Sequence, residues 1–235
     1  ELPALYLEYE EDSRAGVQNL IQKYQKQEEA LKKERERTEQ MKIYEHKYED
    51  LGWICGIDEV GRGPLAGPVV AGAVILPRAS KILYLNDSKQ LTAKKRDELY
   101  DVIMREAVAV GIGYASPARI DEINILQATY EAMRQAVGKL SVCPDILLND
   151  AVTIPGLPQK QVPIIKGDAK SLSIAAASVV AKVTRDRMME ALDAKYPEYG
   201  FASNKGYGSA AHMAALREYG PCPLHRRTFI RNICG

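Results

Sequence analysis

The fold of this chain is indicated most clearly by residues 54–76, which read ICGIDEVGRGPLAGPVVAGAVIL. Two apolar runs, at 54–60 and 68–76, have the length and the β-branched content of buried strands. Between them, Gly61 and Gly63 flank Arg62 and precede Pro64, and these residue types are typical of a turn. The stretch therefore predicts two strands separated by a glycine-rich turn.

The rest of the chain after this stretch alternates between strand-like and helical patterns. Further strands are expected at 108–114, 145–149 and 162–165, and helices at 93–107, 124–140, 171–194 and 209–219. Thr92 and Ser209 are the expected N-caps of two of these helices. The small residues at 175–178 indicate that the helix at 171–194 packs closely against the sheet. We therefore expect an α/β fold with a mixed sheet flanked by helices.

Composition excludes several classes of protein. The chain has 235 residues, 32 Lys and Arg against 31 Asp and Glu, and a net charge of +1. No apolar run approaches the roughly 18–20 residues that a membrane span needs, so no membrane partner is expected. Glycine and proline, at 17 and 12 residues, are too few for a collagen-like or low-complexity chain. Near-neutrality argues at first sight against binding of nucleic acid.

The charge is unevenly distributed, however, and a composition break falls at Leu51. Residues 1–50 carry a net charge of −4, while residues 51–235 carry +5. The first segment is rich in Glu, Lys and Gln with a weak apolar stripe, which predicts a charged helical extension. Two interpretations of this extension stay open, a solvated helix with few contacts and an arm that binds substrate or a partner. Residues 51–235 are expected to form a separate domain.

Four cysteines lie far apart in the sequence, and none forms a Cys-x-x-Cys pair. They are Cys55, Cys143, Cys222 and Cys234. This spacing favours free thiols in a reducing compartment over disulfides or a zinc site. No secretory signal is seen at the N-terminus, so a cytoplasmic location is expected.

Acidic residues follow several of the predicted strands. Asp58 and Glu59 end the first strand, while Asp150 and Asp168 each follow a later one. In α/β sheets such strand ends gather at one edge, where carboxylates repel one another unless a cation lies between them. Oxygen ligands without His or Cys suit Mg²⁺ or Mn²⁺, which predicts the two-metal arrangement of nucleases and polymerases. A polar strand end before a surface turn is the alternative for Asp58 and Glu59.

Neighbouring strand residues point to opposite faces of a sheet, which bears on Asp58 and Glu59. If both acids serve one site, the backbone must bend at Glu59, or Glu59 must contribute through its carbonyl oxygen. Gly61 and Gly63 supply the freedom for such a bend.

Several motifs taken together resemble the bacterial ribonuclease HII family, in the right order over residues 52–230. They are residues 56–70 (GIDEVGRGPLAGPVV), 86–91 (NDSKQL), 166–168 (KGD), 175–186 (AAASVVAKVTRD), 205–208 (KGYG) and 225–226 (HR). The resemblance implies an RNase H-like fold and a metal-dependent endonuclease. Its implied partners are RNA/DNA hybrids, in which it hydrolyses the RNA strand, and duplex DNA with a single embedded ribonucleotide. The nick falls on the 5′ side of that ribonucleotide and leaves 3′-hydroxyl and 5′-phosphate ends, a role in ribonucleotide removal.

The resemblance also assigns residues. It implies that Asp58, Glu59, Asp150 and Asp168 are the catalytic acids and hold two Mg²⁺ or Mn²⁺ ions, with Asp58 bridging them. The turn Gly61-Arg62-Gly63 is expected to contact the 2′-hydroxyl of the ribonucleotide through main-chain groups. Glycine permits such a close backbone approach, and a 2′-hydroxyl both donates and accepts hydrogen bonds.

The remaining expected substrate contacts lie elsewhere in the chain. Tyr207 is expected to pack on the following deoxyribose, and Ser88 and Lys89 to contact phosphates without reading sequence. Asp87 is expected to form the turn or orient Lys89 rather than to bind metal. Asn204 stands where the family commonly has His, which leaves its hydrogen-bonding role open. For Tyr207 the alternative is a core aromatic with a satisfied hydroxyl.

The helix at 171–194 carries three cations whose role the sequence leaves open. Lys182, Arg185 and Arg187 either contact the substrate or form a solvated charged face, and Asp186 is expected to offset one of them. Two rivals to the main assignment also remain. They are a ribonuclease HIII-like enzyme, which Arg62 and Asp168 disfavour, and a non-catalytic hybrid- or DNA-binding module, which four strand-end acids disfavour.

Two further expectations concern the state of the chain. We expect a monomer, and we expect the C-terminal end to be trimmed, because family members often continue past the position of Gly235. The net charge of +1 now has a physical explanation. When the four acids are set aside, about +9 remains over the rest of residues 51–235, so an acidic centre is concealed inside a basic surface.

Overall fold

The structure, a computed structural model, describes Tyr9 and residues 12–234. The helices are α2 (Ala15–Gln40), α3 (Ile43–Tyr48), α4 (Ala93–Glu106), α5 (Pro117–Gly138), α6 (Leu172–Asp193), α7 (Phe201–Asn204), α8 (Ala210–Tyr219) and α9 (Arg231–Cys234). The strands are β1 (Ile54–Val60), β2 (Val69–Ile75), β3 (Ala109–Ala115), β4 (Ile146–Asp150) and β5 (Lys160–Ile164). No helix in this described part is long and apolar enough to cross a membrane.

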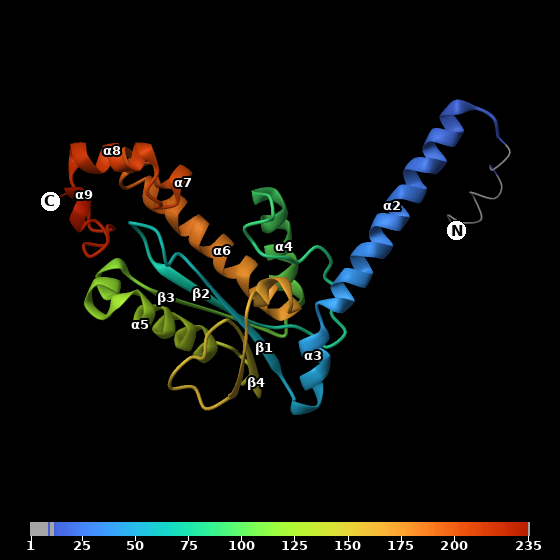
Figure 1. Ribbon diagram of the computed structural model, residues 1–235, viewed down its shortest axis with the longest axis horizontal. Coiled ribbons are helices and arrows are strands. Elements are labelled where there is room, and N and C mark those ends of the chain that lie inside the picture. The colour runs from blue at the N-terminus through green and yellow to red at the C-terminus, as the bar shows by residue number, and fades with distance from the viewer. Residues whose placement is uncertain (1–8, 10–11, 235) are drawn as a thin grey trace.

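The five strands form one mixed sheet in the order β3-β2-β1-β4-β5. β1 pairs antiparallel with β2 and parallel with β4, so it joins an antiparallel half to a parallel half. Figure 1 shows α5 on one face of this sheet and α6 on the other. The predicted α/β fold with helices on both faces is confirmed.

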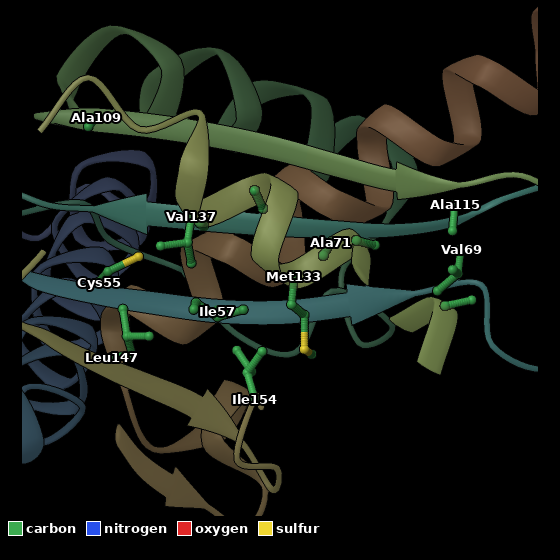
Figure 2. Close-up of a cluster of buried hydrophobic side chains, with 14 of the residues drawn as sticks. Cys55, Ile57, Val69, Ala71, Ala109, Ala115, Met133, Val137, Leu147 and Ile154 are labelled. Carbon is green, nitrogen blue, oxygen red and sulfur yellow. The ribbon is translucent and has the colours of Figure 1, made fainter. Parts of the chain in front are cut away.

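The two faces of the sheet bury separate cores. On the α5 face, Cys55 and Ile57 of β1 pack with Met133 and Val137 of α5, as Figure 2 shows. On the other face, α6 approaches β1 so closely that a Cβ added to Gly56 would lie 2.1 Å from the backbone carbon of Ser173. The small residues at 175–178 pack as closely, as the sequence predicts, since a Cβ added to Gly72 of β2 would lie 2.6 Å from the carbonyl oxygen of Ala177.

Helix starts agree with the sequence where a capping residue marks them. The side chains of Thr92 and Ser209 accept hydrogen bonds from the backbone N–H groups of Lys95 and His212, as N-caps do. The helix predicted around residues 124–140 corresponds to the second part of α5, because Asn124 lies at a kink with φ of 68° and its side chain caps that part. The first part of α5, which begins at Pro117, was not predicted.

The N-terminal extension is mostly one long helix. In Figure 1, α2 projects away from the sheet, while α7, α8 and α9 lie at the opposite end of the molecule. The last turns of α2 contact the rest of the chain, and α3 contacts the start of α6 through Glu45. Glu34 accepts a hydrogen bond from the N–H of Tyr84 at 2.6 Å, and Arg37 donates to the carbonyl of Leu85 at 2.7 Å. The extension therefore contacts the segment just before the loop at 86–89.

Candidate active site

Parallel pairing of β1 and β4 brings two of the predicted acids to one end of the sheet. Ile57 lies opposite Asn149, so Asp58 and Asp150 are the next residues of neighbouring strands. Both project toward the α6 face, because side chains alternate and Leu148 of β4 packs on Ile174 of α6. These two carboxylates therefore share one surface.

The third acid of this surface is Asp168, in the short 3₁₀ turn Gly167–Ala169 before α6. The backbone N–H of Gly167 donates to Asp150 Oδ1 at 2.7 Å. This bond ties the turn to the end of β4, so Asp168 is held beside Asp150.

Glu59 differs from the other acids because its side chain lies on the opposite face of β1. β1 stays paired with β2 through Val60, with Glu59 opposite Ala71, so the bend that one interpretation required at Glu59 is absent. Instead, one carboxylate oxygen of Glu59 accepts a hydrogen bond from Arg62 at 3.2 Å. Its other oxygen, Oε2, is buried without a hydrogen-bond partner.

The charges of the four acids act on one another. Burial raises the pKa of Asp58 well above its usual range, and the charges of Glu59 and Asp150 raise it further. Burial also raises the pKa of Glu59, against the opposing effect of Arg62, and Asp150 adds to the rise. Burial, Asp87 and Asp150 raise the pKa of Asp168. Asp150 therefore lies within electrostatic reach of each of the other three acids.

The acids fit a hard divalent cation by donor type and charge. They offer carboxylate oxygens, including the unpartnered Glu59 Oε2, and their mutual repulsion is what a cation between them would relieve. Within the residues that the structure describes, however, no group of three or more His, Cys, Asp or Glu side chains already stands as a single-ion site.

The predicted glycine turn adopts a conformation that only glycine tolerates at Gly61. Its φ is 88°, and an added Cβ would lie 2.2 Å from Nε of Arg185. Two buried arginines hold this loop from behind. Arg185 donates to the carbonyls of Ala66 and Pro68, and Arg226 donates to those of Gly61 and Arg62. The loop is thus fixed by side chains that sequence reasoning did not single out for this role.

Tyr207 lies beside the turn. A Cβ added to Gly63 would be 4.0 Å from Cε1 of Tyr207, and 43% of Tyr207 is exposed, so the interpretation as a buried core aromatic is wrong. The Arg185 guanidinium carbon is 6.0 Å from the centre of the Tyr207 ring. Asn204 accepts a hydrogen bond from the N–H of Gly206 and donates to the carbonyl of Tyr199, so it shapes the loop before Tyr207.

The loop at 86–89 meets the acids at Asp168. Lys89 lowers the pKa of Asp168 while Asp87 raises it, so both charges act on that carboxyl. Asp87 accepts the backbone N–H of Lys89 at 2.9 Å, which agrees with its expected turn-forming role. Ser88 is only 3% exposed, and its hydroxyl accepts a hydrogen bond from Ser178 at 3.0 Å. Of the two expected phosphate contacts, Lys89 is exposed and the Ser88 side chain is buried.

The three cations of α6 have different surroundings. Lys182 is paired with Asp186 at 2.7 Å, as expected, and Arg187 with Asp97 at 3.0 Å. Arg185 is fully buried, so its placement on a solvated charged face is wrong. Its side chain points inward because the carbonyls of the glycine loop lie on that side of α6. Nothing in the sequence around them distinguishes the buried Arg185 from the exposed Arg187.

The described cysteines form no disulfides, since Cys55, Cys143 and Cys222 are free thiols. Burial raises the pKa of the Cys222 thiol. No zinc-type cluster of His and Cys occurs in the described chain. The prediction of free thiols is thus confirmed for these three residues.

A mixed five-stranded sheet with helices on both faces and carboxylates at adjoining strand ends defines an RNase H-like nuclease fold. Two family models match the chain, "Ribonuclease HII" over residues 55–232 and "Ribonuclease HII N-terminal domain" over residues 1–49. The chain therefore belongs to the ribonuclease HII family, and it is a ribonuclease H-type hydrolase.

Individual relatives agree with this membership. The chain is 64% identical to a ribonuclease HII from Lachnoclostridium phytofermentans, over 96% of this chain and 89% of that one. It is 52% identical to one from Clostridioides difficile, over 97% and 92% of the two chains. Among solved structures, ribonuclease H2 from Pyrococcus horikoshii superposes with a TM-score of 0.65 and 30% identity, over 77% and 97%.

Proposed function

We propose that this chain is a metal-dependent endonuclease that recognises the 2′-hydroxyl of ribonucleotides. It hydrolyses the RNA strand of RNA/DNA hybrids and nicks duplex DNA on the 5′ side of a single embedded ribonucleotide. The products carry 3′-hydroxyl and 5′-phosphate ends, which suits a role in ribonucleotide removal.

One geometric observation supports this proposal most directly. Arg62 of the glycine turn bonds Glu59 at 3.2 Å, and Gly63 of the same turn lies against the ring of Tyr207. A residue of the acid cluster, the turn and an exposed aromatic ring are thus continuous. A nuclease that cuts beside one ribonucleotide needs this combination, because the scissile phosphate is attached to the 5′ side of the sugar that carries the 2′-hydroxyl, so one surface must meet both groups.

The acids would hold Mg²⁺ or Mn²⁺, as two ions at the site formed by Asp58, Glu59, Asp150 and Asp168. When bound, such ions polarise the phosphate and lower the pKa of a coordinated water. Glu59 would contribute through its carbonyl oxygen while its side chain stays on the face opposite Asp58, or through its unpartnered Oε2 once that side chain turns toward Asp58.

The chain's own residues would select the substrate. Main-chain groups of Gly61, Arg62 and Gly63 contact the 2′-hydroxyl, and Tyr207 packs on the deoxyribose that follows. Lys89 is free to approach a backbone phosphate, while Ser88 would act through its backbone because its hydroxyl is engaged with Ser178. The monomeric state and the cytoplasmic location stay predictions.

The decisive experiment is a nicking assay on duplex DNA that carries one ribonucleotide, with an all-RNA/DNA hybrid measured in parallel. Wild-type enzyme should cut both substrates with Mg²⁺ or Mn²⁺ and neither with a chelator. Asp58→Asn should abolish cleavage of both while binding the duplex, because it removes an acid and leaves the basic surface unchanged.

The matched control is Asp101→Asn, which removes the same charge from an exposed position. This variant should cut at the wild-type rate. Cleavage of the hybrid alone would favour the ribonuclease HIII-like alternative. Metal-independent binding without cleavage of either substrate would favour the non-catalytic module.

A further inference from the structure

One short segment, residues 222–226, binds the glycine turn and is linked through His212 to Tyr207, the two elements proposed to recognise the ribonucleotide. We infer that His225 and Arg226 are positioning residues that hold the glycine turn and Tyr207 in fixed register. Arg226 does this directly at the turn, and His225 acts on Tyr207 through His212. The inference rests on the proposed recognition of a single ribonucleotide.

Arg226 binds the turn through backbone carbonyls. Its Nη2 donates to Gly61 O at 2.5 Å, its Nη1 to Arg62 O at 2.8 Å, and its Nη2 and Nε to Gly67 O at 2.9 and 3.1 Å. The side chain is fully buried. The planar fork of guanidinium thus fixes both ends of the loop 61–67, which the single ammonium of lysine could not do.

The charge of Arg226 has no ion-pair partner among the described residues. Burial lowers its pKa to about 9, so the group is still cationic at neutral pH. Its compensation comes from carbonyl dipoles, and each dipole must point at the guanidinium to compensate a buried charge. The orientation of the Gly61 and Arg62 peptides is therefore coupled to the position of Arg226.

A chain of hydrogen bonds leads from residue 222 to Tyr207. The N–H of Cys222 donates to His225 Nδ1 at 3.0 Å, so Nδ1 of His225 is an acceptor and its Nε2 carries the proton. His225 Nε2 lies 3.0 Å from His212 Nε2, and His212 Nδ1 lies 2.8 Å from the carbonyl oxygen of Tyr207. A carbonyl only accepts, so His212 is protonated on Nδ1 and accepts on Nε2.

This arrangement defines one tautomer for each ring, with both rings neutral. Every polar atom in the relay then has a matching partner, from Cys222 through His225 and His212 to Tyr207. The carbonyl of Tyr207 is fixed by a donor whose orientation depends on the residue beside Arg226.

Backbone contacts unite the three segments. Arg226 N–H donates to Leu65 O at 2.8 Å, and Gly67 N–H donates to Leu224 O at 2.9 Å. Leu65 N–H in turn donates to Gly206 O at 2.9 Å, one residue before Tyr207. The turn, the Tyr207 loop and residues 222–226 thus form one hydrogen-bonded unit. A displacement of the His225 and Arg226 side chains would therefore shift both the turn and Tyr207.

The first test is the pair Arg226→Lys and Arg227→Lys, an identical exchange at a buried and a neighbouring exposed position. The readout is the ratio of cleavage rates at a lone ribonucleotide and along an all-RNA strand. A misplaced turn can still meet some 2′-hydroxyl on an all-RNA strand, whereas a lone ribonucleotide offers one register. Arg226→Lys should therefore lower the ratio about tenfold or more, and Arg227→Lys should leave it within about twofold.

The second test uses His212, where two amides imitate different ring nitrogens. His212→Asn places an amide donor near Nδ1 and should keep much of the ratio, because the bond to the Tyr207 carbonyl can form. His212→Gln places its amide near Nε2, loses that bond, and should lower the ratio several-fold more. Thermal unfolding of each variant shows whether it is folded. If Arg226→Lys does not fold, the comparison of His212→Asn with His212→Gln tests the inference.

The outcomes separate the inference from the proposed function. A wild-type enzyme that nicks single ribonucleotides while Arg226→Lys and His212→Gln lower both rates equally would overturn the inference. A wild-type enzyme that cannot nick such DNA would refute the proposed function instead. In that case the inference is tested by NMR of the free protein. The chemical shifts of the Tyr207 ring protons should change in Arg226→Lys and stay unchanged in Arg227→Lys. Unchanged Tyr207 shifts in both variants would overturn the inference.

Discussion

Asp150 accepts a hydrogen bond from the backbone N–H of Gly167 at 2.7 Å, and this contact joins the end of β4 to the turn that carries Asp168. Asp150 also raises the pKa of Asp58, Glu59 and Asp168 through its charge. One carboxylate therefore has two separable effects. Its oxygen organises the turn, and its charge repels the other acids.

Asp150→Asn separates these effects, because the amide oxygen can still accept the Gly167 bond while the charge is removed. Cleavage should be lost to below about 1% of wild type, since a predicted metal ligand is gone. The free energy of unfolding without divalent ions should rise by roughly 1 kcal/mol, because repulsion at Asp58 falls. Chemical denaturation in a chelator at neutral pH measures this.

Asp150→Ala is the informative partner of that variant, since it removes both the charge and the acceptor. It should be less stable than Asp150→Asn. If the two variants have equal stability, the Gly167 bond does not organise the turn.

Glu45 of α3 is expected to stabilise the start of α6. Its Oε1 accepts hydrogen bonds from Ser171 Oγ at 2.6 Å and from the N–H of Ser173 at 2.9 Å. Glu45→Ala leaves both donors without this partner and should lower the free energy of unfolding by about 1–3 kcal/mol. The exposed Glu36→Ala on α2 should change it by less than about 0.5 kcal/mol. Similar losses in urea denaturation of both variants would contradict this assignment.

Acid should destabilise the protein through the buried histidine pair. Burial, with a contribution from His212 and Arg227, lowers the pKa of His225 from 6.5 to about 4. The unfolded chain takes up a proton near pH 6.5 and the folded chain only near pH 4, so stability is present above pH 6.5 and is lost as the pH falls toward 4.

His225→Gln cannot titrate at this position, so its stability should fall less steeply than that of wild type between pH 6.5 and 4. The difference between the two slopes of stability against pH removes the contribution of other groups. These groups include the acids with raised pKa, which make the folded state more stable as the pH falls. Parallel slopes for the two proteins in denaturation at several pH values would show that folding does not lower the pKa of His225.

Tyr207→Ala tests the proposed packing on deoxyribose. The rate at a lone ribonucleotide should fall about tenfold or more, and the rate along an all-RNA strand should fall less, because only the former depends on the RNA–DNA junction. Tyr114→Ala is a matched control, since Tyr114 is similarly exposed on the edge strand β3. Equal losses on both substrates would count against a junction-reading role.

The extension illustrates the limit of composition as evidence. A charged segment with a weak apolar stripe predicts a helix, and α2 confirms it over Ala15–Gln40. The sequence did not show which part of α2 contacts the rest of the chain, because the residues that make the contact are charged like those on the exposed side. Glu34 and Arg37 bind backbone groups at Tyr84 and Leu85, whereas nearby charges such as Lys33 and Glu36 lie on the exposed side.

The sequence by itself determined the local features of the site, because their causes are local. Asp58 lies near the end of β1 and Asp150 ends β4, a positive φ at Gly61 requires glycine, and serine and threonine caps mark helix starts. Tertiary structure decided which side chains meet. The regular pairing of β1 placed Glu59 on the face opposite Asp58, and only the folded loop carbonyls drew Arg185 and Arg226 inside. A guanidinium can be buried only where carbonyl dipoles surround it, and for Arg185 and Arg226 those carbonyls belong to a loop far away in the sequence.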